Sequence, residues 1–227
     1  MLKLISGYEN PSSSVGGEGF FYANSDFSII GQTAPNQGIT IKGYPILSAL
    51  KHDQAVPTDE GAHNLIMRHI THRKGNRPKN DGSGENYEED NITFRNSTGN
   101  IYLDHISTSY GADEAISLQP NVKPFLTGST VANCFMTECD PAHNTGGIMG
   151  SKSDRGNLED SGNITYAYNG FYNISHRFPN PSGGGNMGII EMYNNFASNW
   201  YSKLSRINGS GNFDYLKEQE AYMIRLL

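Results

Sequence analysis

Short apolar runs separated by Gly, Ser, Asn and Pro follow one another along most of the chain, and they are too short to form helices. Residues 26–31 (DFSIIG) and 38–43 (GITIKG) each place β-branched residues between turn formers, which predicts two strands joined by a turn. Residues 101–103 and 115–118 show the same pattern on either side of an acidic turn. The pattern predicts a protein built mainly from strands.

A looser repeat begins near residue 64, in which apolar residues precede a polar one and the segment ends on Ile or Phe. The polar column comprises Arg68, Asp104, Asn133, Asn169 and Asn194, and the closing apolar column comprises Ile70, Ile106, Phe135, Phe171 and Phe196. By subtraction, the polar positions lie 36, 29, 36 and 25 residues apart, a range typical of stacked supersecondary repeats. We therefore expect a solenoid with the asparagines on successive coils and the three phenylalanines in the core.

The two ends of the chain differ from this pattern. Residues 1–25 are polar and Gly-rich, and we expect a loose N-terminal segment there. Residues 212–227 combine helix formers with apolar side chains after an early Asp, which predicts a C-terminal helix that caps the last coil. No linker divides the sequence, so residues 1–227 are expected to form a single domain.

Composition supports an all-β reading, with 26 Gly and 10 Pro among 227 residues and only 18% charged residues. The net charge of −6 argues against general binding of nucleic acid. No apolar run is long enough to span a membrane, and no signal peptide is visible at the start. The two cysteines, Cys134 and Cys139, are expected to be free thiols.

The turn between residues 103 and 115 concentrates acidic groups, namely Asp104, Asp113 and Glu114. Carboxylates this close repel one another unless they face solvent or share a cation. A solvated turn, a cation site and the paired carboxylates of a glycoside hydrolase all fit this stretch.

Five segments, in this order, also resemble the pectate lyase family of polysaccharide lyases: SIIGQTAPNQGITIKGY, NLIMRHITHRKGN, NIYLDHISTSYGADEAIS, GGIMG and NGFYNISHRFP. The resemblance extends over roughly residues 26–200. It implies a right-handed parallel β-helix, which agrees with the repeat. It also implies calcium-dependent β-elimination of polygalacturonate by a secreted, monomeric enzyme that binds neither nucleic acid nor membrane.

Matched position by position, the resemblance places a calcium site on Glu89, Asn91, Asp113 and Glu114. Calcium prefers such oxygen ligands and would let an acidic protein hold a polyanion. At two positions where the family has carboxylates, this sequence has Asn91 and Ser117, so we expect weaker calcium binding than in typical relatives.

The family's catalytic base is an arginine, and the match assigns it to Arg177. At two further positions where the family has basic residues, this sequence has Thr145 and Ser182. We expect His143 and Lys152 to bind substrate in place of those basic residues. These replacements keep a second hypothesis open, in which the chain is a non-catalytic polysaccharide-binding, spike or adhesin module.

Overall fold

The structure is a computed structural model, and it describes a little over half of the chain. The described residues are 21–23, 25–35, 38–42, 45–48, 62–75, 90–95, 97–119, 128–137, 144–149, 163–181, 186–187, 189–200, 202, 212–213, 216–219 and 222–224. Glu89, Cys139, His143, Lys152 and Ser182 lie outside these ranges.

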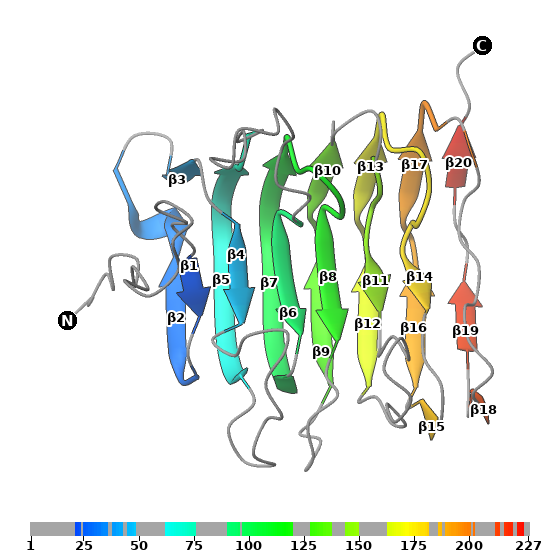
Figure 1. Ribbon diagram of the computed structural model, residues 1–227, viewed down its shortest axis with the longest axis horizontal. Helices are drawn as coiled ribbons and strands as arrows, with labels where there is room; N and C mark the ends of the chain where they lie inside the picture. The colour runs from blue at the N-terminus through cyan, green and yellow to red at the C-terminus, as the bar shows by residue number, and fades with distance from the viewer. Residues whose placement is uncertain are drawn as a thin grey trace, which may run out of the picture.

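Two parallel sheets form the body of the molecule and lie one behind the other (Figure 1). The smaller sheet contains β1 (Phe21–Ala23), β4 (Ile46–Ser48), β6 (Ile92–Arg95), β8 (Ile116–Gln119), β11 (Ile148–Met149) and β14 (Asn180–Pro181). The larger sheet begins with β2 (Phe27–Ile30), β3 (Ile39–Lys42), β5 (Ala62–Arg73), β7 (Ser97–Ser109), β9 (Ser129–Ala132) and β10 (Phe135–Thr137). It continues with β12 (Ile164–Ala167), β13 (Gly170–Tyr172), β16 (Ile190–Tyr193), β17 (Phe196–Ser198), β19 (Leu216–Gln219) and β20 (Tyr222–Ile224).

Successive coils pair with one another along the axis, so that the chain passes repeatedly from the larger sheet to the smaller one. Two further strands, β15 (Asn186–Met187) and β18 (Asn212–Phe213), pair separately, and η1 (Gly31–Thr33) is a short 3-10 helix. This winding is a parallel β-helix, as the repeat predicted. None of the helices in the described part of the chain has the length and apolarity needed to span a bilayer.

A column of left-handed residues bends the larger sheet at the same point in five successive coils. Its members are His69, His105, Asn133, Tyr168 and Asn194, with φ between 52° and 57°. Strand pairing aligns them, because Asp104 pairs with Ala132, and Ala132 with Ala167. A single left-handed residue interrupts the strand direction, and Asn tolerates it better than most residues. This column separates β9 from β10, β12 from β13 and β16 from β17.

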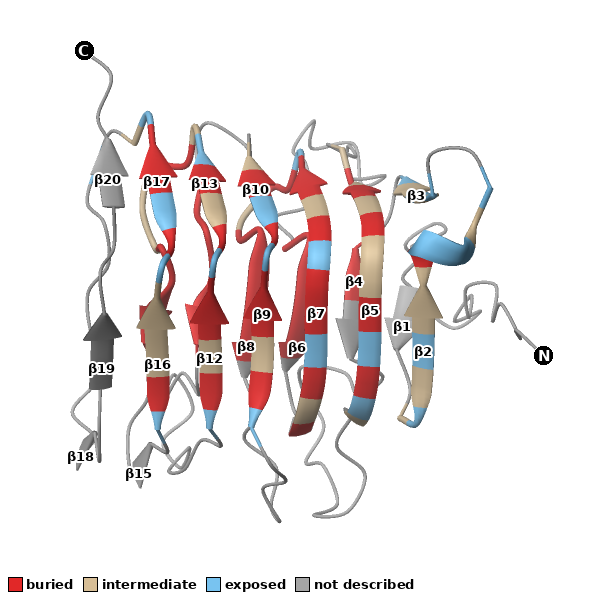
Figure 2. Cartoon of the chain, turned by 180° about the vertical axis from the view of Figure 1, so that it is seen from behind, coloured by how far each residue is buried: buried red, intermediate tan, exposed pale blue. Residues whose placement is uncertain are grey.

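The core lies between the sheets and is filled from both. From the larger sheet it receives Leu65, Met67, Leu103, Val131 and Phe171, all less than 1% exposed. From the smaller sheet come Ile92, Phe94, Ile116 and Leu118, which are equally buried. Figure 2 shows buried residues recurring at corresponding positions of the neighbouring strands. The apolar positions are therefore stacked between coils, as a solenoid requires.

The predicted columns leave the observed register at the third coil, because Asp104 pairs with Ala132 and Ser107 with Phe135, and they shift by one further position at the fourth coil. Asn169 does not align with Asn133; its side chain accepts a hydrogen bond from the Cys134 amide at 3.0 Å and donates to Asn195 at 3.0 Å. Phe171 is buried, but Phe135 and Phe196 are 47% and 40% exposed. A shift of one residue turns a side chain to the other face of a strand, which explains both errors.

The structure at the two ends of the chain also differs from what the sequence predicted. The predicted C-terminal helix is wrong, because residues 212–224 contribute β18, β19 and β20 in parallel pairing with earlier coils. Residues 1–20 lie outside the described part, and within the supposedly loose segment Phe21–Ala23 forms β1, paired with β4. Backbone hydrogen bonds to the preceding coil thus outweigh local helix propensity at the C-terminal end.

Candidate active site

The site forms where the chain enters four neighbouring strands of the smaller sheet. Asn91 precedes β6, Glu114 comes shortly before β8, Thr145 before β11 and Arg177 before β14. Backbone bonds stack these entry segments: the Asn91 amide donates to the Glu114 carbonyl at 2.8 Å, and the Ala115 amide donates to the Thr145 carbonyl at 3.0 Å. Side chains from four coils therefore meet at one edge.

Three carboxylates gather at this edge. Asp90, Asp113 and Glu114 each offer an oxygen, and these atoms lie within 4.8 Å of one another. Asp90 accepts hydrogen bonds from the Thr93 hydroxyl and, at 3.3 Å, from the Glu114 amide. Asp90 and Glu114 are buried, and Asp113 is about 29% exposed. So much negative charge in a partly buried place requires positive charge nearby.

Arg177 supplies part of that charge. Its Nη1 forms an ion pair with Oε1 of Glu114 and lies 4.0 Å from Oδ1 of Asp113. With three carboxylates and one guanidinium, the formal charge of the group is −2. The guanidinium therefore balances the acidic cluster only in part.

A local irregularity places Arg177 at this position. Thr145 pairs with His176, an offset of 31 residues, whereas Ile148 pairs with Asn180, an offset of 32. One extra residue thus lies between His176 and Asn180, which is a β-bulge, and Arg177 has φ of 63°. A left-handed conformation is uncommon for arginine and bulges often redirect a side chain at functional sites. The bulge turns Arg177 toward the carboxylates.

Asn91 follows Asp90 directly at this edge. Its side chain is wholly buried, and among the described residues neither its Nδ2 nor its Oδ1 has a hydrogen-bond partner. It lies against Gly111, where an added Cβ would come within 2.8 Å of Nδ2. A buried amide without partners is costly, and such a group calls for a ligand or water. Carboxylate and amide oxygens are the donor set that calcium prefers, so these residues fit that ion.

Of the residues predicted from the sequence, the structure brings together Asn91, Asp113, Glu114 and Arg177. Glu89, His143 and Lys152 lie outside the described residues. Asp90 was not among the predicted ligands, although it stands two residues before β6, as Glu114 stands two residues before β8, and this shared position could have identified it.

Two positions where the family has other residues have structural roles here. Thr145 is buried and bridges Glu114 and His176 through the backbone. Ser117 is also buried, and its Oγ accepts a hydrogen bond from the Ile148 amide at 3.1 Å. Ser117 therefore completes the pairing of β8 with β11.

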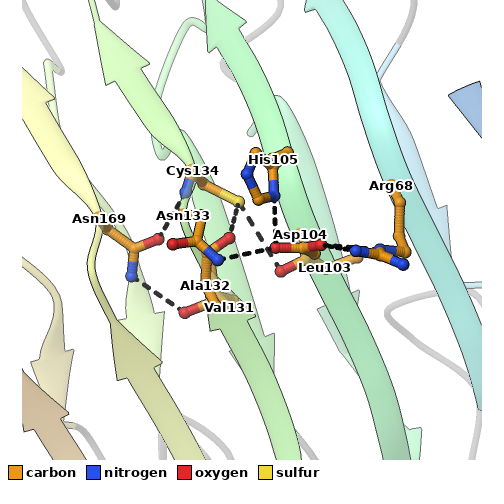
Figure 3. Close-up of polar contacts among 9 residues, drawn as sticks. All are labelled: Arg68, Leu103, Asp104, His105, Val131, Ala132, Asn133, Cys134 and Asn169. Carbon is orange, nitrogen blue, oxygen red and sulfur yellow. Dashed lines mark hydrogen bonds and ion pairs between the residues drawn. The ribbon is translucent and has the colours of Figure 1, made fainter. Parts of the chain in front are cut away.

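Asp104 lies in a different cluster, on the larger sheet (Figure 3). Its Oδ2 accepts from Arg68 Nε at 2.7 Å, and its Oδ1 lies 2.7 Å from His105 Nδ1 and accepts from Asn133 Nδ2 at 2.9 Å. Burial raises the pKa of Asp104, but the hydrogen bonds from Asn133, Arg68 and His105 outweigh it and hold the pKa below its usual value. His69 stacks on His105 at 4.5 Å. Asp104 groups with these histidines and not with Asp113 and Glu114.

Comparison with known proteins agrees with this architecture. A family model described as pectate lyase matches residues 36–224. Probable pectate lyase C of Emericella nidulans is 26% identical over 173 residues, and that of Aspergillus oryzae is 27% identical. Each alignment covers 76% of this chain but 32% of the relative, so the chain spans about a third of their length.

A solved structure, that of a thermostable pectate lyase, superposes with a TM-score of 0.50 at 21% identity. The superposition covers 89% of this chain and 55% of that protein, and it supports the β-helical fold. The family model extends over most of the sequence, and the chain belongs to the pectate lyase family.

Proposed function

We propose that this protein is a secreted polysaccharide lyase that cleaves pectate by calcium-assisted β-elimination in a right-handed β-helix. The observation that supports this most strongly is the placement of Arg177 beside Asp113 and Glu114. A guanidinium and a carboxylate cluster from distant parts of the sequence meet at one edge of the sheet. Family membership agrees with the same chemistry.

Asn91, Asp113 and Glu114, together with Asp90, are the residues that would hold calcium. Their oxygens are of the type that calcium binds, and the formal charge of −2 left after pairing with Arg177 matches one divalent ion. Bound calcium would neutralise the carboxylate of a uronate and stabilise the negative charge that develops on the adjacent carbon.

Arg177 is the proposed base. It removes the proton from the carbon beside the uronate carboxylate, a carbon–carbon double bond forms, and the bond to the glycosidic oxygen breaks. The electron pair of that bond leaves with the oxygen, which takes up a proton from water. Arginine is normally protonated, so Arg177 must give up a proton before it can act as a base. Its Nη1 is paired with Glu114, and it must leave that carboxylate to reach the substrate.

The first test is an assay for unsaturated product. The double bond conjugated to the carboxylate absorbs in the ultraviolet, whereas a hydrolysed product does not. We expect the protein to release this product from polygalacturonate, and we expect Arg177→Lys to reduce the rate by about 10² or more. Arg68→Lys is a matched control, because Arg68, like Arg177, pairs with a buried carboxylate, but in the other cluster. A wild-type protein that releases only saturated product, or none, would refute the proposal.

The second test concerns the Glu114 carboxylate, which both Arg177 and calcium would use. Because Glu114 pairs with Arg177 and is also a proposed ligand, the ion pair and calcium binding should oppose one another. Arg177→Gln should therefore bind calcium more tightly than the wild type, and Glu114→Gln should bind it more weakly. Isothermal titration calorimetry with calcium alone measures both effects. Equal affinities in all three proteins would exclude Glu114 as a ligand.

A further inference from the structure

Four exposed aromatic side chains surround one glycine on the outer face of the larger sheet, whereas the candidate active site lies at the strand entries of the smaller sheet. Phe135 and Phe196 pair with Gly170 from the two neighbouring strands, and Tyr168 and Tyr172 lie two residues before and after it on its own strand path. We call Phe135, Tyr168, Tyr172 and Phe196 the aromatic platform. Their exposed fractions are 47%, 56%, 38% and 40%.

The backbone holds these rings in a fixed arrangement. Parallel strands lie about 4.8 Å apart, so Phe135 and Phe196 are separated by roughly 10 Å across Gly170. The ring of Phe135 lies against Gly170, since an added Cβ there would come within 2.8 Å of Cδ2. Tyr168 makes an edge-to-face contact with Tyr193 at 5.6 Å. Figure 2 shows exposed segments on β10, β13 and β17 side by side on this face.

Charge on the same face is of one sign. This face consists of the outward positions of β3, β10, β13 and β17 and of the second halves of β5 and β7. Among the described residues at these positions, the charged side chains are Lys42 and Arg73, and none is a carboxylate. Lys42 is exposed and pairs with Arg73 on the adjacent strand. The chain as a whole has a net charge of −6. A surface whose described positions carry two cations and no acid, on an acidic protein, is complementary to a polyanion.

We propose that the aromatic platform, with Lys42 and Arg73, is a second binding surface for an acidic polysaccharide. Aromatic rings stack on the apolar faces of sugar rings, and exposed rings in register along a solenoid present a straight track to a linear polymer. The two cations meet carboxylates of the same chain. Only the choice of pectate as the polymer rests on the proposed function. Attachment at a second site raises the local concentration of substrate at the first.

The experiment is depletion of the protein from solution by insoluble cross-linked pectate, with a chelator present so that the calcium-dependent site does not contribute. The double variant Phe135→Ala/Phe196→Ala should bind about tenfold more weakly than the wild type. Tyr102→Ala, which removes an exposed ring from the other part of the sheet, is the matched control and should bind as the wild type does. Equal binding by the double variant, or an equal loss in the control, would overturn the proposal.

Two further measurements separate the alternatives. Lys42→Glu should weaken binding to pectate and leave binding to fully methyl-esterified pectin unchanged; an equal effect on both polymers, or none, contradicts an acidic ligand. Light scattering after gel filtration tests whether the platform joins two copies of the chain, and a dimer that the double variant abolishes would overturn the proposal. Depletion does not need turnover, so the two proposals can fail independently. A protein that makes no unsaturated product but is depleted by pectate refutes only the proposed lyase activity, whereas one that makes the product but is not depleted refutes only the second binding surface.

Discussion

Tyr166 connects the two sheets through a buried hydrogen bond, and its removal is a sensitive test of how the site is supported. Its hydroxyl, on β12, donates to the Ile116 carbonyl on β8 at 3.0 Å. The neighbouring amide of Ile148 is engaged by Ser117 Oγ at 3.1 Å. Tyr166→Phe would therefore remove one oxygen atom and leave the Ile116 carbonyl without this donor, two residues after Glu114.

The magnitude follows from the burial of the bond. Tyr166 is wholly buried, and loss of one partner of a buried hydrogen bond costs about 1–3 kcal/mol of unfolding free energy. For a protein of this size each kcal/mol lowers Tm by about 2–4 °C, so we expect a decrease of roughly 2–12 °C. Burial raises the pKa of Tyr166 well above its usual value, so the hydroxyl stays a donor and the decrease should not vary with pH from neutral to mildly alkaline conditions.

Calorimetric melting of the wild type and the variant measures this effect. Tyr172→Phe is the matched control, because Tyr172 lies on the next strand of the same coil but is exposed. An unchanged Tm for Tyr166→Phe, or a decrease no larger than that of the control, would show that the bond does not stabilise the coil.

The remaining predictions concern packing and pH. Phe171→Ala should lower the unfolding free energy by about 3–5 kcal/mol in denaturant melts, because Phe171 is wholly buried and packs edge-to-face on Phe178 at 5.3 Å. Phe135→Ala should lower the unfolding free energy far less, because Phe135 is exposed. Similar decreases in the two variants would contradict the observed register. Asp104→Asn should destabilise the protein most near neutral pH. The pKa of Asp104 is lower in the folded state than its usual value of 3.8, so the stability it contributes is present above that value and is lost as pH falls through the folded pKa. Melting across an acidic pH series checks this, and a difference between variant and wild type that grows toward low pH would contradict it.

The sequence alone determined the class of architecture and much of its chemistry. Alternation within 26–31, 38–43 and 101–103 identified strands correctly, because burial of one face of a strand is a local property of the sequence. The ordered segments from GQTAP to HRFP indicated the family. Asp113, Glu114 and Arg177 were selected by that resemblance, and their types suit a cation and a base.

Only the tertiary structure decided where these residues lie relative to one another. Asn169 aligns with Asn195 and not Asn194, and the extra residue before Asn180 turns Arg177 toward Glu114. Each of these is a shift of one residue between strands some 30 positions apart. Alternation within a strand is unchanged by such a shift, whereas the hydrogen bonds and packing between coils differ completely. Register is therefore set by contacts between coils, and a pattern within one coil does not contain that information.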